Sequence, residues 1–131
     1  MTNSSTIELA QRFVRALNAK DEAAIREIYA PDARIWHNFD RKVQSIDENM
    51  RGMYWIHKRL SNINYDVVRL VEIPDGYVQE HVLRGKLASG EDFALPACVI
   101  CTVKNGRVVA LNEYLDLTQT LPLTEQRATA S

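Results

Sequence analysis

Three side chains of this sequence have the chemistry needed to move protons near neutral pH: His37 in IWHN, His81 in QEHVL and Glu113 in NEYLDL. Imidazole exchanges protons close to neutrality, and a carboxylate is a common general acid or base. By strand alternation, Glu113 shares one face with three apolar residues, Val109, Leu111 and Leu115. If that face lines a pocket, Glu113 suits acid/base catalysis. If the face is partly exposed, Glu113 is a solvated surface residue.

The orientation of His37 depends on the register of the strand that carries it. If Arg34 points to water, alternation turns Ile35 and His37 inward. The opposite register turns Trp36 and Asn38 inward, and a β-bulge could reconcile the two. Inside a pocket, His37 is the expected base or shuttle and Asn38 a donor to a developing oxyanion. The alternative for His37 is a core or dimer-interface histidine.

The other candidate side chains each have two interpretations. His81 shares a strand face with Tyr77 and Leu83, whereas Glu80, Val82 and Arg84 occupy the opposite face. Either face could line the pocket, so His81 and Glu80 are not both expected there. His57 stands beside Lys58 and Arg59, which predicts a surface position. Tyr54 is either a plain core residue or part of a substrate site.

The spacing of cysteines and histidines predicts neither a metal nor a cofactor. No H-x-H, H-E-x-x-H or paired C-x-x-C motif is present, and no glycine-rich phosphate loop is found. Cys98 and Cys101 lie in FALPACVICTV, which reads as a strand, where residues three apart face opposite sides. We therefore expect two reduced thiols rather than a redox pair.

Hydrophobic periodicity predicts the helices and strands that carry these residues. Ser5 or Thr6 can cap a first helix, Asp21 a second, and Ser45 or Asp47 a third that runs to Leu60. A strand is expected at 33–38 and a loop at 39–44. Four β-segments follow, separated by turn signals that include Asn105-Gly106; they span 63–73, 77–87, 91–103 and 106–117. Residues 118–131 read as a frayed tail.

This order predicts an α+β domain in which three N-terminal helices pack on a curved, mainly antiparallel sheet. Such a sheet forms a cone with an open mouth where a small-molecule pocket can lie. The 131 residues are expected to form a single domain, with a core at about 6–118.

Composition limits the partners of the domain. Sixteen basic against seventeen acidic residues give a net charge of −1, so no nucleic-acid footprint is expected. The N-terminus lacks the features of a signal peptide, and no apolar run approaches the roughly 20 residues of a membrane span. We therefore expect no membrane partner and a cytoplasmic location.

Two segments carry a family resemblance: QRFVRALNAKDEAAIREIYAPDARIW near the start and NGRVVALNEYLDL at the end. With them, residues 6–118 resemble the NTF2-like superfamily, in its SnoaL-like and ketosteroid-isomerase-like branch. The resemblance implies the cone-shaped fold and a homodimer. It does not fix a reaction, because this fold supports several chemistries and also non-catalytic binders.

The catalytic residues of ketosteroid isomerase are not retained. The positions of its tyrosine and two aspartates align with Phe13, His37 and Cys98. Phenylalanine donates no hydrogen bond and a neutral thiol donates poorly, so steroid isomerisation is not expected.

The resemblance to limonene-epoxide hydrolase is partial. Glu113 and Asn38 keep usable chemistry, whereas Trp36 replaces a tyrosine. Glu80 and Val82 replace an arginine and an aspartate, although Arg84 could substitute for the arginine. The SnoaL-like cyclases and scytalone dehydratase, which use histidine and acid pairs without a cofactor, are the nearest chemical match.

The sequence thus leads to two hypotheses. The first is a cofactor-free isomerase, dehydratase or cyclase that binds a small, largely apolar substrate, with His37 as base or shuttle, Glu113 as partner acid, and Asn38 and His81 assisting. The second is a non-catalytic ligand-binding or assembly domain. Either way, the expected pocket lining is Phe13, Trp36, Tyr54, Val82, Arg84, Cys98 and Leu111.

Overall fold

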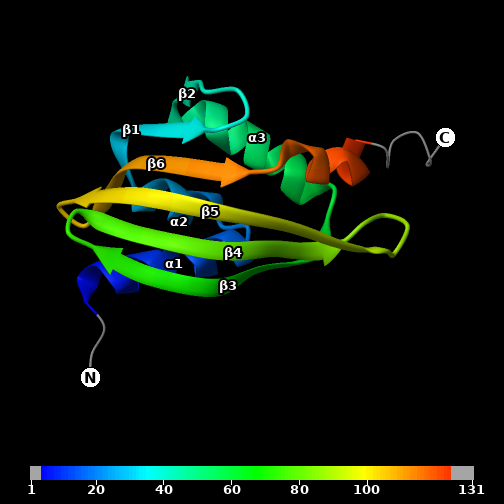
Figure 1. Ribbon diagram of the computed structural model, residues 1–131, viewed down its shortest axis with the longest axis horizontal. Coiled ribbons are helices and arrows are strands. Elements are labelled where there is room, and N and C mark those ends of the chain that lie inside the picture. Colours follow the sequence, from blue (N-terminus) through cyan, green and yellow to red (C-terminus); the bar gives the residue numbers. More distant parts are fainter. Residues whose placement is uncertain (1–3, 125–131) are drawn as a thin grey trace.

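The computed structural model describes residues 4–124, and Figure 1 shows helices packed against one face of a curved sheet. The helices are α1 (Ser5–Asn18), α2 (Glu22–Ile28), α3 (Ile46–Lys58) and the short 3-10 helix η1 (Leu117–Thr120). The strands are β1 (Tyr29–His37), β2 (Val43–Gln44), β3 (Ser61–Ile73), β4 (Gly76–Lys86), β5 (Asp92–Lys104) and β6 (Arg107–Leu115). The predicted α+β class is confirmed.

The six strands form one mixed sheet in the order β2-β1-β6-β5-β4-β3. Strands β3 to β6 make the predicted antiparallel meander, and their bounds match the expected segments to within two residues. Strand β1 lies parallel to β6, which brings an early and a late part of the chain side by side (Figure 1). The sheet is therefore mainly, but not wholly, antiparallel.

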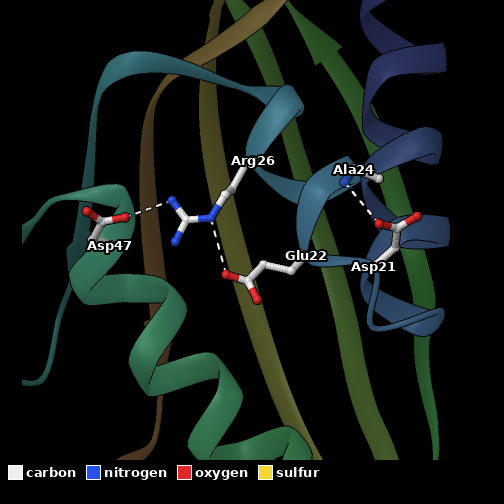
Figure 2. Close-up of polar contacts among 5 residues, drawn as sticks. All are labelled: Asp21, Glu22, Ala24, Arg26 and Asp47. Carbon is white, nitrogen blue, oxygen red and sulfur yellow. Dashed lines mark hydrogen bonds and ion pairs between the residues drawn. The ribbon is translucent and has the colours of Figure 1, made fainter.

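Short polar side chains set the helix starts, as the sequence indicated. Ser4, rather than Ser5 or Thr6, caps α1, because its hydroxyl accepts the Ile7 amide at 3.1 Å. Asp21 caps α2 in the predicted manner, by accepting the Ala24 amide at 3.1 Å (Figure 2). At α3, Ser45 and Glu48 form a reciprocal capping box.

Helix α2 is tied to the start of α3 by Arg26 (Figure 2). The guanidinium Nη1 lies 2.7 Å from Asp47 Oδ1, and Nε lies 3.3 Å from Glu22 Oε1. All three side chains are substantially exposed, so the network contributes little stability and mainly orients the two helices.

The strand and loop boundaries between α2 and α3 differ from those expected. Strand β1 begins at Tyr29 rather than residue 33, because its first residues pair with β6 before a shift in register. Within the expected loop, Val43 and Gln44 pair with β1 as the edge strand β2. The Asp40 carboxylate accepts the Lys42 amide at 3.0 Å, which holds the turn between them.

The predicted frayed tail is wrong for its first residues. Leu117–Thr120 forms η1, residues 121–124 are helical, and Leu123 is fully buried. Leu123 packs with Leu60, Leu83, Phe93 and Leu95 in a second apolar cluster at one end of the sheet. This segment closes that cluster, so the core continues past residue 118. The rest of the expected tail, 125–131, lies outside the described residues.

The two cysteines face opposite sides of β5, as alternation predicted. Cys101 is completely buried, Cys98 is half-buried on the other face, and both are free thiols. Burial raises the pKa of Cys101 to about 12, so it stays a protonated core residue.

No helix between residues 4 and 124 is long and apolar enough to cross a membrane.

Candidate active site

A cavity of about 220 Å³ lies between the concave face of the sheet and helices α1 and α3. Most of its wall is apolar, including Phe13 and Leu17 from α1, Met53 and Ile56 from α3, and Val99 from β5. An apolar enclosure of this kind strengthens any electrostatic interaction within it. The few polar side chains that reach it are therefore the candidates for chemistry.

His37 and Glu113 meet at one side of this cavity. The parallel pairing of β1 with β6 places the two residues directly opposite each other. His37 Nε2 lies 2.9 Å from Glu113 Oε1. The side chain of His37 is 10% exposed and that of Glu113 is 23% exposed. The pair is thus close enough to share a proton, and its carboxylate is the more accessible member.

The second ring nitrogen of His37 is isolated. Within the described residues, Nδ1 is buried and has no hydrogen-bond partner. A buried N–H without a partner is costly, whereas a carboxylate oxygen is a good acceptor for a hydrogen bond from the ring. These two facts place an N–H on Nε2, directed at Glu113.

Gln79 and His81 form a second polar group, on β4. Both are buried, and the Gln79 amide nitrogen Nε2 lies 2.9 Å from His81 Nδ1. Burial lowers the pKa of His81, and the Glu113 carboxylate opposes part of that effect. His81 is therefore neutral near pH 7 and lines the cavity as an uncharged ring.

His57 is not on the surface, and the prediction that placed it there is wrong. Only 5% of the residue is exposed, and its Nε2 lies 2.7 Å from the hydroxyl of Tyr65 on β3. Lys20 donates to the His57 carbonyl at 3.1 Å, which closes the end of α3. Burial, with a smaller effect of Lys20, lowers the pKa of His57 to about 4. The Tyr65 ring stands between His57 and His81 and lines the cavity itself.

Five of the site residues predicted from sequence line the cavity, and the others lie outside it. His37, Glu113, His81, Phe13 and Leu111 all line the cavity. The register question is answered at β1, because Ile35 and His37 are buried and Arg34 is exposed.

Asn38 and Trp36 do not line the cavity. The side-chain oxygen Oδ1 of Asn38 accepts the backbone amide of Leu115 at 3.0 Å, and the backbone N–H of Asn38 donates to the Glu113 carbonyl at 3.1 Å. Asn38 therefore extends the β1–β6 pairing and lies outside the cavity lining. Trp36 points to the convex face of the sheet and packs edge-on against Tyr114.

The remaining expected lining residues also lie elsewhere. Val82, Arg84 and Cys98 face the convex side, because Gln79 and His81 take the concave face of β4 and alternation leaves the other face to them. Arg84 pairs there with Asp66 at 3.0 Å. Tyr54 is 65% exposed and borders a separate surface groove between α2 and α3.

Gln79 and Tyr65 line the cavity but were not among the site residues predicted from sequence. Gln79 is two positions from His81, so the alternation that placed His81 also placed Gln79 on the same face. Tyr65 has no such indicator, because its position depends on α3 folding back against β3. In residues 4–124, no group of three or more His, Cys, Asp or Glu is arranged to hold a metal ion.

A curved sheet closed on one face by helices over an apolar pocket defines the NTF2-like, ketosteroid-isomerase-like class of folds. More narrowly, residues 10–111 match the model of the SnoaL-like domain, and the chain belongs to that family. The search of curated proteins gave no match.

Solved structures of low sequence identity share the fold. IdmH from Streptomyces antibioticus, described as a putative polyketide cyclase, is 18% identical with a TM-score of 0.81, covering 92% of this chain and 99% of its own. AclR from Streptomyces galilaeus, described as a putative hydroxylase, is 14% identical with a TM-score of 0.81, covering 92% and 81%. A hypothetical protein with a ketosteroid-isomerase-like fold from Catenulispora acidiphila, in complex with trimethylamine, is 16% identical with a TM-score of 0.74, covering 88% of this chain and 91% of its own. At these identities the likeness establishes the fold alone.

Proposed function

We propose that this SnoaL-like protein is a cofactor-free acid/base enzyme acting on a small, largely apolar substrate, by a reaction of the isomerase, dehydratase or cyclase type. The observation that carries the proposal is the His37–Glu113 pair, 2.9 Å apart at the wall of an apolar cavity. Ionisable side chains in an apolar wall add little to packing, and a paired histidine and carboxylate at such a wall are typical of a site of proton transfer.

Within this pair, the geometry supports Glu113 as the base and His37 as its proton partner. This assignment reverses the one expected from sequence. Glu113 is the more exposed of the two, and the buried Nδ1 of His37 is out of reach of a ligand. Glu113 takes a proton from one carbon or oxygen of the substrate and, as the carboxylic acid, returns it to another, while the Nε2–H of His37 donates to the carboxylate and holds it in place.

The wall composition supports the substrate class. Apolar and aromatic side chains surround the pair, so a small hydrocarbon-rich molecule buries most of its surface there. The description of IdmH as a putative polyketide cyclase agrees with a carbon skeleton that is activated by proton removal.

The test is a substrate screen over lactones, epoxides, enones and hydroxylated aromatics, followed by variants on any substrate that turns over. Glu113→Gln keeps the shape of the side chain but cannot accept a proton, so kcat should fall about 100-fold or more. His37→Ala removes the partner nitrogen and should also reduce kcat.

Glu80→Gln is the matched control, since Glu80 is an exposed carboxylate on the convex face of β4. It should leave kcat unchanged. Turnover that survives Glu113→Gln would contradict the assignment. Ligand binding without turnover in the wild-type protein would favour the non-catalytic binding domain instead.

A further inference from the structure

The two polar groups of the cavity are arranged as a row across the sheet. Pairing places His37 opposite Glu113, Glu113 opposite Val99, and Val99 opposite Gln79. Two strand spacings, roughly 10 Å, therefore separate the Glu113 and Gln79 positions, with Val99 as the floor between them. A ligand lying on Val99 meets the His37–Glu113 pair at one end and the Gln79–His81 pair at the other.

The contact between Gln79 and His81 determines which nitrogen of His81 carries the proton. The atom of Gln79 that faces the ring is the amide nitrogen, 2.9 Å from His81 Nδ1. An amide NH2 only donates, so Nδ1 must be the acceptor and must be unprotonated. The proton of the neutral ring is then on Nε2.

The Nε2–H of His81 has no hydrogen-bond partner in residues 4–124, although the residue as a whole is only 4% exposed and lines the cavity. The ring of Tyr65 makes an edge contact with the His81 ring, with centroids 5.5 Å apart. Since His37 Nδ1 is the one side-chain nitrogen or oxygen in these residues that is both fully buried and without a partner, the Nε2 of His81 is accessible from the cavity, where a ligand can supply the acceptor.

We propose that Gln79 fixes His81 as the Nε2–H tautomer, and that His81 thereby recognises an oxygen acceptor, such as a carbonyl, at the end of the substrate remote from Glu113. The inference rests on the proposed function and narrows its substrate class to apolar molecules bearing a carbonyl or comparable oxygen. Gln79 is a positioning residue, because it acts through His81.

The chemistry of this arrangement is that of a neutral electrophile opposite a base. Removing a proton next to a carbonyl moves negative charge onto the carbonyl oxygen. A neutral imidazole N–H held in place can stabilise that oxygen without itself giving up a full charge. Burial, which lowers the pKa of His81, keeps the ring in the neutral form that this role needs.

The tautomer is tested directly by long-range nitrogen–proton NMR correlations on the labelled protein at neutral pH. The wild-type His81 ring should show a protonated Nε2 and an unprotonated Nδ1. In Gln79→Glu, the carboxylate is an acceptor, so Nδ1 should become protonated. A protonated Nδ1 in the wild-type protein overturns the proposal, and this measurement needs no variant to fold.

Recognition is tested with indanone and indane, two ligands of similar size of which only the first has a carbonyl. The wild-type protein should bind indanone about five- to tenfold more tightly than indane. His81→Phe keeps a planar ring and should abolish that preference, and Gln79→Leu, which removes the donor to Nδ1, should reduce it. A wild-type protein with no preference, or a His81→Phe protein that keeps it, overturns the proposal.

Glu113→Gln separates this inference from the proposed function. That variant should lose turnover and yet keep both the His81 tautomer and the preference for indanone. If turnover survives in Glu113→Gln while the tautomer is as expected, the proton-transfer assignment fails and the recognition proposal stands.

Discussion

His57 is a neutral imidazole enclosed by protein, and this makes the stability of the fold depend on pH. Its pKa is about 4 in the folded protein, against an ordinary value of 6.5. The unfolded chain therefore binds a proton between these two values that the folded chain does not. The stabilisation is fully present above pH 6.5 and is lost as pH falls toward 4, for a total of about 3 kcal/mol.

We expect the free energy of unfolding in urea to fall markedly between pH 7 and about pH 4.5 in the wild-type protein. His57→Gln cannot titrate, so its stability should fall less over the same interval, even if it is lower at pH 7. His81, whose pKa is also lowered by burial, accounts for part of the remaining slope. Equal slopes in both proteins would show that His57 does not control the acid response.

The position of His57 also shows what residue-scale reading can miss. Lys58 and Arg59 beside it indicated a surface position, but on a helix the residues seven positions apart share a face. Met50, seven positions before His57, is buried as His57 is. The seven-residue spacing from Met50 thus predicts the buried position of His57 correctly, whereas the charges of Lys58 and Arg59 predict an exposed one.

At the scale of elements, local sequence patterns were sufficient to predict the strands of the meander, β3 to β6, but not the register of β1. Turn residues and alternation predicted β3 to β6 closely, because antiparallel neighbours are joined by short loops. The register of β1 was left open between His37 and Trp36. It is set by pairing with β6, a contact between distant segments that no local pattern encodes. The same pairing decides that Asn38 clamps the strand ends instead of lining the cavity.

Two glycines offer a matched test of element packing. A Cβ on Gly76, at the start of β4, would overlap the carbonyl oxygen of Cys101 on β5. Gly76→Ala should therefore push the two strands apart and lower the free energy of unfolding by at least about 2 kcal/mol. Gly52, within α3, has open space around its Cβ position. Gly52→Ala should raise stability by about 0.5–1 kcal/mol, because alanine favours the helix.

Chemical unfolding of both variants checks this pair of predictions. A Gly76→Ala protein as stable as the wild type would mean that the β4–β5 contact is looser than the structure shows.

At the scale of the whole molecule, the convex face of the sheet is notable for its apolar side chains. Val71, Ile100 and Tyr114 are each more than a third exposed there, and Trp36 packs beside Tyr114. Charged pairs such as Arg84–Asp66 lie on the same face. An apolar centre with polar neighbours is typical of a protein–protein interface, and a second copy of the chain is the partner we expect.

We predict a homodimer, with a mass by light scattering about twice the 14.9 kDa of one chain. Ile100→Glu places a charge in the centre of the apolar area and should shift the protein to monomer. Tyr54→Glu, a comparable change at an exposed aromatic residue on α3, should leave the dimer intact. A wild-type monomer, or dissociation by Tyr54→Glu alone, would contradict this interface.

The parallel pairing of β1 with β6 has a consequence for how the protein is made. The clamp between Asn38 and Leu115 joins positions 77 residues apart, and the His37–Glu113 pair lies beside it. While the chain is being synthesised, the N-terminal helices and β1 emerge from the ribosome long before β6 exists. Contacts between such distant segments also form slowly. The acid/base pair is therefore assembled only when the sheet is complete, and a half-made chain exposes His37 without the carboxylate that it meets in the finished protein.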